Sequence, residues 1–330
     1  MYRIIISADE ENQRLDRFLK KYLRAAPLSL IYRIIRKDVK VNGSRASIDT
    51  MLNHGDEIDI YLDDKRIEGL LREEKTPPRG NRIDIIFEDE NVLIVFKPAD
   101  LLTHGDEKEK SNTLANRVLG YMLENGSYDA AAARSFTPSP VNRLDRNTTG
   151  IVVFGKKPKA IRDLNNMLKH EGEVEKYYLT VVRGSLTEAL TLRDRMLKDE
   201  SENRVTVLPA DSPEGRLSET KVRPVSAFNG YTLVEVSLIT GRTHQIRAHL
   251  ADAGFPVIGD RKYGDRGVNM QLSQKFGLNS QLLHAHEIVI NKGRESLEYL
   301  TGRKFKCDPP EQFKKIVEGL GGNAADKLLH

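Results

Sequence analysis

Hydrophobic residues near the N-terminus recur at helical spacing in two segments. In residues 15–23 the apolar positions lie three or four apart, with basic side chains opposite them. Pro27 breaks this pattern, Ser29 can cap a second helix, and the apolar positions of residues 31–35 form its inner stripe. The pattern predicts two amphipathic helices with exposed basic faces.

Strand periodicity follows these helices. Residues 39–41 indicate a short strand that meets Asn42-Gly43, a strong signal for a two-residue hairpin turn. Residues 55–62 then alternate polar and apolar positions, as a half-buried strand does. Together these segments predict a small α/β module over residues 1–62.

The chain changes character after this module. Residues 63–80 are charged, contain Pro77-Pro78 and show no sustained period, so we expect a linker there. We expect one large domain over residues 81–318 and a tail over residues 319–330.

The large domain alternates strands and helices irregularly. Two hairpins are predicted, one from residues 83–87 and 92–96 and a clearer one from residues 218–228 and 231–239. Helices are predicted over residues 113–123 and from Pro158, and a buried strand over residues 176–182. This order predicts an α+β fold around a mixed sheet and argues against a doubly wound dinucleotide fold.

Composition and length add broad limits. The 330 residues suffice for two domains, and the single cysteine, Cys307, excludes an intramolecular disulfide and fits a reducing compartment. No run approaches the roughly 18 apolar residues of a membrane span, and the first residues lack a signal-peptide pattern. We therefore expect a cytoplasmic protein.

The net charge of +4 is unevenly distributed. Residues 14–40 contain nine lysines or arginines against two aspartates. Such a basic patch attracts a polyanion through phosphate contacts and counterion release. The alternative is an ordinary solvated helix face.

One candidate for chemistry is Asp145, in a polar turn that ends at Gly150 before an apolar strand. Asp145 lies between Arg143 and Arg146, which favour its ionised form. An ionised carboxylate suits nucleophilic or ion-pairing work better than acid catalysis. The same pattern is also typical of a surface ion pair.

A second cluster covers residues 240–250. Gly241 ends a strand, and Thr243 can cap a helix on which Arg247 lies one turn beyond the start. His244 and His249 are five residues apart, which places them poorly for one helical face. His284 and His286 share a strand face without nearby acid or cysteine partners, so we expect no metal.

The N-terminal segment resembles the alpha-L RNA-binding module. The matching pieces are Arg14-Leu15-Asp16, the turn after Val41 and the Gly55-Asp56-Glu57-Ile58 ending, and the resemblance covers residues 14–62. It implies that the paired helices lie against structured RNA. The RNA-binding candidates on these helices are Arg17, Lys20, Lys21, Arg33, Arg36 and Lys37.

The large domain resembles the RluA class of RNA pseudouridine synthases. The motifs that match in order are Ile94 to Ala99, Arg143-Leu144-Asp145 with Thr149-Gly150, Lys176 to Gly184, Gly241 to Arg247, Pro256 to Gly264 and Leu283-His284-Ala285. The resemblance implies the pseudouridine synthase fold, with a mixed, mainly antiparallel sheet flanked by helices. It also implies a reaction that needs no cofactor or metal.

The resemblance also implies roles for four residues. Asp145 would be the nucleophile, and Arg247 would pair with it and keep it ionised. Arg143 would fill the stack left by a flipped base, and Tyr178 would stack on the flipped uracil and handle a proton at carbon 5. Asn142 departs from the family, which usually has His there, so we expect residue 142 to be structural.

We therefore expect an enzyme, an RNA pseudouridine synthase that acts on structured RNA, foremost large-subunit (23S) ribosomal RNA. Transfer RNA is the nearest alternative substrate. A non-catalytic RNA-binding or ribosome-assembly factor on the same fold is a further alternative, and a glycosidic hydrolase would need a second positioned carboxylate. The expected partner is RNA, with no membrane and no second copy of the chain.

Overall fold

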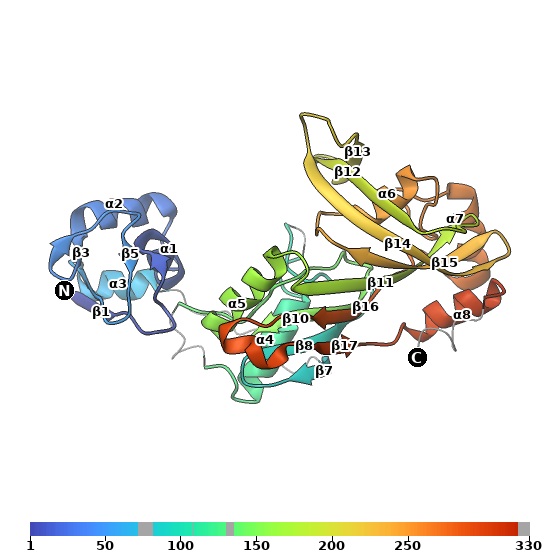
Figure 1. The fold of residues 1–330 in the computed structure, drawn as a ribbon. Helices are drawn as coiled ribbons and strands as arrows, with labels where there is room; N and C mark the ends of the chain where they lie inside the picture. Colours follow the sequence, from blue (N-terminus) through green and yellow to red (C-terminus); the bar gives the residue numbers. More distant parts are fainter. Residues whose placement is uncertain (72–81, 108, 130–134, 323–330) are drawn as a thin grey trace. The chain divides into compact units, whose positions relative to one another are not determined.

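A computed structural model describes residues 1–71, 82–107, 109–129 and 135–322 (Figure 1). The chain divides into two compact units. The first consists of Met1–Arg82, Asn116–Ser139 and Gly155–Arg162, and the second of Ile83–Ala115, Pro140–Phe154 and Asp163–His330. No helix within the described residues is long and apolar enough to cross a membrane.

The N-terminal part of the first unit is a small α/β module. Its four-stranded sheet has the order β1 (Tyr2–Ile5), β6 (Glu57–Ile60), β3 (Val39–Val41), β4 (Ser44–Arg45). The remaining elements are α1 (Leu15–Tyr22), α2 (Leu28–Asp38) and the paired strands β2 (Gln13–Arg14) and β5 (Met51–Leu52). The apolar stripes of both helices are buried in one core, which confirms the predicted helices. Asn42 and Gly43 both have positive φ, at 50° and 76°, as the predicted hairpin turn requires.

Two local expectations for this module were wrong. Ser29 does not cap α2, because the helix begins at Leu28 after Pro27 and has no side-chain cap. Strand β6 does not alternate cleanly, because Asp59 is buried and accepts a hydrogen bond from Arg3 of β1 at 2.7 Å. The sequence pattern did not reveal β1, whose partner strand lies more than fifty residues away.

A helix occupies the first part of the expected linker. Helix α3 (Asp64–Leu70) begins at Asp63, whose carboxylate accepts the Arg66 amide hydrogen at 2.8 Å. Ile67 is fully buried in the core of the module. The compact module therefore extends past residue 62, and residues 72–80 of the expected linker lie outside the described residues.

The second unit is organised around an eleven-stranded sheet. The strand order is β13-β12-β14-β15-β11-β16-β10-β8-β7, with β17 beside β16 and β9 beside β10. The bounds are β7 (Asp84–Glu88), β8 (Val92–Lys97), β9 (Ser139–Pro140), β10 (Thr149–Gly155), β11 (Val174–Arg183), β12 (Leu190–Asp199), β13 (Arg204–Leu208), β14 (Arg216–Phe228), β15 (Tyr231–Leu238), β16 (Leu283–Ile290) and β17 (Arg303–Lys306). Strands β10 and β16 are parallel, whereas β11 through β15 pair antiparallel. The predicted α+β fold with a mixed, mainly antiparallel sheet is confirmed.

The helices of the second unit include α6 (Gln245–Asp252), α7 (Arg266–Phe276), α8 (Glu311–Gly319) and a 3-10 turn, η1 (Glu295–Leu300). Most of α4 (Leu114–Glu124) belongs to the first unit, and α5 (Pro158–Lys169) is divided between the two units. Leu272 of α7 and Val317 of α8 share one core with Leu179 of β11. Leu320 is buried in the same core, so the domain continues past the boundary expected at residue 318.

The parallel pairing of β10 with β16 fixes the position of the loop that precedes β10. Gly150 lies opposite Ala285 with a φ of 117°, and a Cβ at residue 150 would lie 2.1 Å from the Ala285 carbonyl oxygen. Only glycine fits there. Ala285 also pairs with Tyr178 of β11, so the end of the loop and Tyr178 lie against the same strand.

Candidate active site

Asp145 lies in the loop between β9 and β10, which is fixed on both sides of this residue. Thr103 exchanges hydrogen bonds with the backbone of Leu144, donating to its oxygen at 3.1 Å and accepting from its nitrogen at 3.2 Å. On the other side, Lys97 donates to the Arg146 oxygen at 2.7 Å. The carboxylate is therefore presented by a held backbone.

Lys97 is fully buried beneath this loop. Its ammonium donates to the backbone oxygens of Pro98, Leu101 and Arg146 at 2.9, 2.7 and 2.7 Å. Burial lowers the pKa of Lys97 to about 7, and the charge of Asp145 opposes that shift. The three carbonyls accept all three protons of the ammonium, so Lys97 holds the backbone of this loop in place.

Asn142 also bonds to backbone. Its amide nitrogen donates to the Ile151 oxygen at 3.2 Å, and its amide oxygen accepts the Val153 amide hydrogen at 2.8 Å. Both contacts attach the loop to β10 and agree with a structural role at residue 142. Thr149 uses its hydroxyl as well, at 2.8 Å from Nδ1 of His284.

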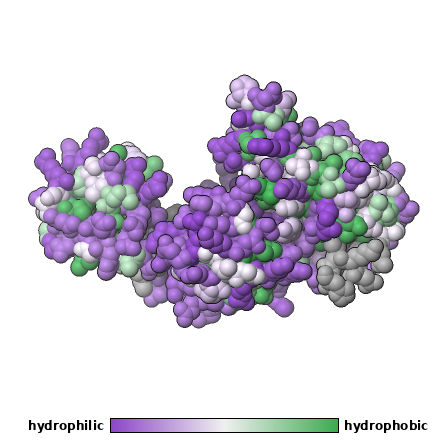
Figure 2. Space-filling model, in the orientation of Figure 1, coloured by the Kyte–Doolittle hydropathy of each residue, from purple (hydrophilic) through white to green (hydrophobic). Residues whose placement is uncertain are grey.

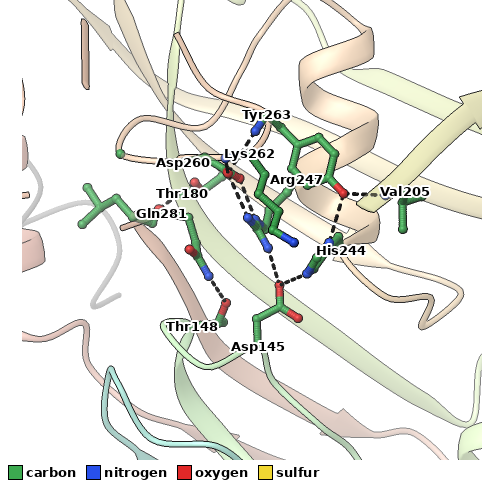
Figure 3. Close-up of polar contacts among 12 residues, drawn as sticks. Asp145, Thr148, Thr180, Val205, His244, Arg247, Asp260, Lys262, Tyr263 and Gln281 are labelled. Atoms are coloured by element: carbon green, nitrogen blue, oxygen red, sulfur yellow. Dashed lines mark hydrogen bonds and ion pairs between the residues drawn. The ribbon is translucent and has the colours of Figure 1, made fainter. Parts of the chain in front are cut away.

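The structure brings Asp145 and Arg247 together across about a hundred residues of sequence. Arg247 Nη1 donates to Asp145 Oδ2 at 2.9 Å, and the two side chains are 7% and 23% exposed (Figure 3). The ion pair expected from the resemblance is therefore present. Arg146, the arginine that follows Asp145, instead lies 3.7 Å from Asp106.

A second carboxylate holds the other side of Arg247. Asp260 is completely buried and accepts from Nε at 2.6 Å and Nη2 at 2.8 Å (Figure 3). Burial works to lower the pKa of Arg247, but the bonds and charge of Asp260, and then those of Asp145, raise it. The guanidinium is thus a fixed cation whose Nη1 group faces Asp145. Asp260 occurs in a matching motif, but no pattern in the sequence indicated this contact.

Helix α6, which carries Arg247, does not begin as predicted. The N-cap residue is His244, with a left-handed φ of 53° and no side-chain cap bond, so the prediction of Thr243 as the cap was wrong. The side chain of Gln245 instead holds the turn before the helix, accepting from the Arg242 amide and the Thr240 hydroxyl at 2.9 and 2.8 Å. This turn directs His244 toward Asp145, a position that sequence spacing did not indicate.

Tyr178 lines the same cavity as Asp145. Its side chain is buried, and its hydroxyl makes no hydrogen bond within the described residues. Burial, followed by the negative charge of Asp145, raises the pKa of Tyr178. The phenol therefore stays protonated near neutral pH.

Two adjoining hollows meet at Asp145. A small one of about 60 Å³ is lined by Asp145, Tyr178 and Ile246, among others. A wider one of about 430 Å³ contains Asp145 together with basic side chains, including Arg261 and Lys262. Arg143 is exposed and lines both. The site thus combines a small cavity beside the carboxylate with a cationic approach to it.

The six candidate RNA-binding residues of the N-terminal module are all exposed. They are Arg17, Lys20 and Lys21 on α1, and Arg33, Arg36 and Lys37 on α2. In Figure 2 the visible face of this module is mostly hydrophilic. Among the described residues, no group of three or more His, Cys, Asp or Glu side chains is arranged to hold a metal ion.

Comparisons with known proteins agree with this geometry. Residues 91–252 match the profile of the RNA pseudouridylate synthase family. The ribosomal large subunit pseudouridine synthase C of Salmonella typhi is 34% identical over 97% of this chain and 97% of its own length. The chain belongs to the RNA pseudouridylate synthase family. It is thus an isomerase that converts uridine to pseudouridine.

Other members of the family extend the match. The synthase C of Haemophilus ducreyi is 36% identical over 86% of this chain and 85% of its own length. The solved structure of human RNA Pseudouridylate Synthase Domain Containing 4 has a TM-score of 0.55 and is 20% identical, covering 72% of this chain and 92% of that one. At that identity the human structure supports the pseudouridine synthase fold alone.

Proposed function

We propose that this pseudouridine synthase modifies specific uridines of large-subunit (23S) ribosomal RNA, with Asp145 as the nucleophile. The observation that carries the catalytic part is the buried Asp260–Arg247–Asp145 arrangement beside a small cavity. The ribosomal substrate is supported by full-length similarity to relatives named as large-subunit synthases. The exposed basic helices supply a surface that suits folded RNA.

Each side chain has a defined task in this proposal. The Asp145 carboxylate, held ionised by Arg247, starts the breaking of the bond between uracil and ribose. Tyr178 provides a flat wall for the detached base. Because burial raises its pKa, Tyr178 is a protonated phenol before the uridine binds.

Arg143 has the task of a wedge. A uridine in folded RNA must leave its stack before a side chain reaches its glycosidic bond, at a cost of a few kcal/mol. Arg143 is exposed at the edge of both hollows and is a planar cation that can stack in the vacated place. The nucleophile and the wedge thus lie two residues apart on one held loop.

The test is tritium release from RNA labelled at carbon 5 of uridine. The intact protein should release tritium from 23S ribosomal RNA transcripts, and Asp145→Asn should release none. Asp106→Asn is the matched control, because it removes a carboxylate from the same cleft without touching Arg247, and it should retain activity. Release only from transfer RNA would overturn the ribosomal substrate, and activity of Asp145→Asn would overturn the nucleophile.

We also propose that the protein works as a cytoplasmic monomer bound to RNA. Cys307 is partly buried, and burial raises its pKa to about 12, which keeps it a thiol. Light scattering of the purified protein, with and without a 23S fragment, tests the monomer.

A further inference from the structure

The Oδ2 atom of Asp145 faces two cationic or donor groups. Arg247 Nη1 bonds to it at 2.9 Å, and His244 Nε2 lies 4.0 Å from the same atom (Figure 3). The His244 side chain is only 8% exposed. No bond of the other carboxylate oxygen, Oδ1, occurs within the described residues. The two oxygens of the nucleophile are therefore in different environments.

The contacts of Tyr263 define the proton positions on His244. The Val205 amide donates to Tyr263 Oη at 2.8 Å, so that bond does not use the hydroxyl hydrogen. The other partner of Oη in the described part of the chain is His244 Nδ1, at 3.0 Å. The hydroxyl hydrogen is therefore left for Nδ1, and when the hydroxyl donates it there, Nδ1 is the unprotonated nitrogen. Neutral His244 then carries its hydrogen on Nε2, the nitrogen that faces Asp145.

The neutral form is the one expected at working pH. Burial lowers the pKa of His244 to about 4. The charged groups that face it are Asp145 and Asp260, which oppose this shift, and Arg247 and Lys262, which add to it.

Tyr263 also positions the second group at Oδ2. Its amide donates to Asp260 Oδ1 at 3.1 Å, and its ring lies 5.2 Å from the Arg247 guanidinium carbon. One short segment, residues 260–263, therefore holds Arg247 through Asp260 and holds His244 through the Tyr263 hydroxyl (Figure 3).

A purely structural role does not account for His244. Residue 244 has a left-handed backbone, which His adopts more often than most residues but which Asn and Asp adopt as well, so the backbone alone does not require an imidazole. The imidazole makes no capping bond at the start of α6. What the imidazole adds is a donor directed at the nucleophile.

We propose that His244 is a positioning residue for Asp145, with Tyr263 fixing its tautomer so that Nε2–H becomes a second donor to Oδ2 and leaves Oδ1 to react. This inference rests on the proposed role of Asp145 as nucleophile. At 4.0 Å the contact is longer than a hydrogen bond, and it closes when uridine fills the cavity and displaces water. Two donors on one oxygen fix the rotation of the carboxylate about its side-chain bond.

Nitrogen-15 NMR of the histidine side chains tests the tautomer directly. In the intact protein, His244 should show an unprotonated Nδ1 and a protonated Nε2. Tyr263→Phe removes only the hydroxyl and should give a mixture of tautomers. Tyr299→Phe is the matched control, since it removes a hydroxyl that bonds Asp89 and should leave the His244 signals unchanged. A protonated Nδ1 in the intact protein would overturn the proposal.

Kinetic measurements test whether the donor of His244 contributes to turnover. Tyr263→Phe should lower kcat about 10-fold with KM for RNA unchanged, on the scale of one hydrogen bond. His244→Asn keeps the backbone conformation but cannot reach Asp145, and should lose more, whereas His244→Gln retains a donor near the Nε2 position and should restore part of kcat. Wild-type kcat in His244→Asn would refute the role. If the intact protein released no tritium from any RNA, the proposed function would fail while the tautomer result would still stand.

Discussion

The two carboxylates on Arg247 differ in what they contribute. Asp145 is 23% exposed and keeps contact with the cavity, whereas Asp260 is fully buried and also accepts two backbone amide hydrogens. Removing one partner of a buried pair leaves an uncompensated charge, which typically costs about 3–5 kcal/mol. The first carboxylate therefore serves the reaction, and the second serves the fold of the site.

Substituting each carboxylate by its amide separates these effects. Asp260→Asn should lower the free energy of unfolding by about 3 kcal/mol and reduce kcat, because Arg247 loses its anchor. Asp145→Asn should abolish turnover while changing that free energy by about 1 kcal/mol or less. Urea unfolding and single-turnover tritium release measure the two quantities. If the two variants lowered the free energy of unfolding equally, burial of the carboxylate would not determine how much each ion pair contributes to stability.

Residue 142 offers a second contrast at this scale. Asn142 bonds the backbone of β10 through both ends of its amide, and neither bond reaches Asp145. Asn142→His should therefore keep turnover within a few-fold of the intact protein, and Asn142→Leu should cost about 1–3 kcal/mol of stability by leaving two backbone groups unpaired. A rise in turnover by orders of magnitude in Asn142→His would contradict the structural role. Tritium release and thermal unfolding of both variants provide the measurement.

Among the elements, those set by local chemistry were predictable from sequence. The hairpin of β14 and β15 turns at Asn229-Gly230, where both residues have positive φ, as the pattern indicated. Strand β1 and helix α3 were missed, since β1 exists through its pairing with β6, and the short α3, which Asp63 caps, packs on the module through Ile67 and Leu70. Propensity is a weak guide where tertiary contacts decide the structure.

In the site, too, features with a local sequence signal were predicted, and features that depend on tertiary contacts were missed. The loop carrying Asp145 and the start of β11 were found from ordered motifs, and the pairing of Asp145 with Arg247 followed from family resemblance. The contacts of Asp260 and of His244 with Tyr263 were not found. These contacts depend on how the start of α6 packs against residues 260–263. Periodicity in the sequence does not predict that packing.

Helix α2 permits a test of the basic face. Arg33 and Arg36 are exposed and should contact phosphates, so Arg33→Gln with Arg36→Gln should weaken RNA binding and reduce the slope of log K against log salt by about 1 per lost contact. Lys65→Gln with Arg66→Gln removes the same charge from exposed positions on α3 and is the matched control. Filter binding at several salt concentrations gives both slopes. The same change in slope for the two pairs would mean that net charge, and not the α2 face, governs binding.

At the scale of the whole molecule, buried neutral histidines link stability to pH. Burial lowers the pKa values of His244, His249 and His284 to about 4. Between pH 6.5 and that value the unfolded chain binds protons that the folded chain does not, so the free energy of unfolding must fall as the pH falls. Each such histidine contributes up to about 1.4 kcal/mol per pH unit in this window. The carboxylates with lowered pKa values, such as Glu173 and Asp260, lower the free energy of unfolding only at still lower pH, where they become protonated.

His249 is suited to test this linkage away from the nucleophile. Its Nδ1 lies 2.8 Å from the Thr220 hydroxyl, whereas its buried Nε2 has no hydrogen-bond partner in the part of the chain that the structure describes and lies 4.0 Å from Asp194. His249→Asn keeps a polar group near Thr220 and removes the titrating ring, so the variant should lose less stability than the intact protein between pH 6.5 and 5. Urea unfolding at half-unit pH steps measures both curves. Parallel curves would mean that His249 takes up its proton equally in the folded and unfolded chains, and the acid sensitivity would then have to come from His244 and His284.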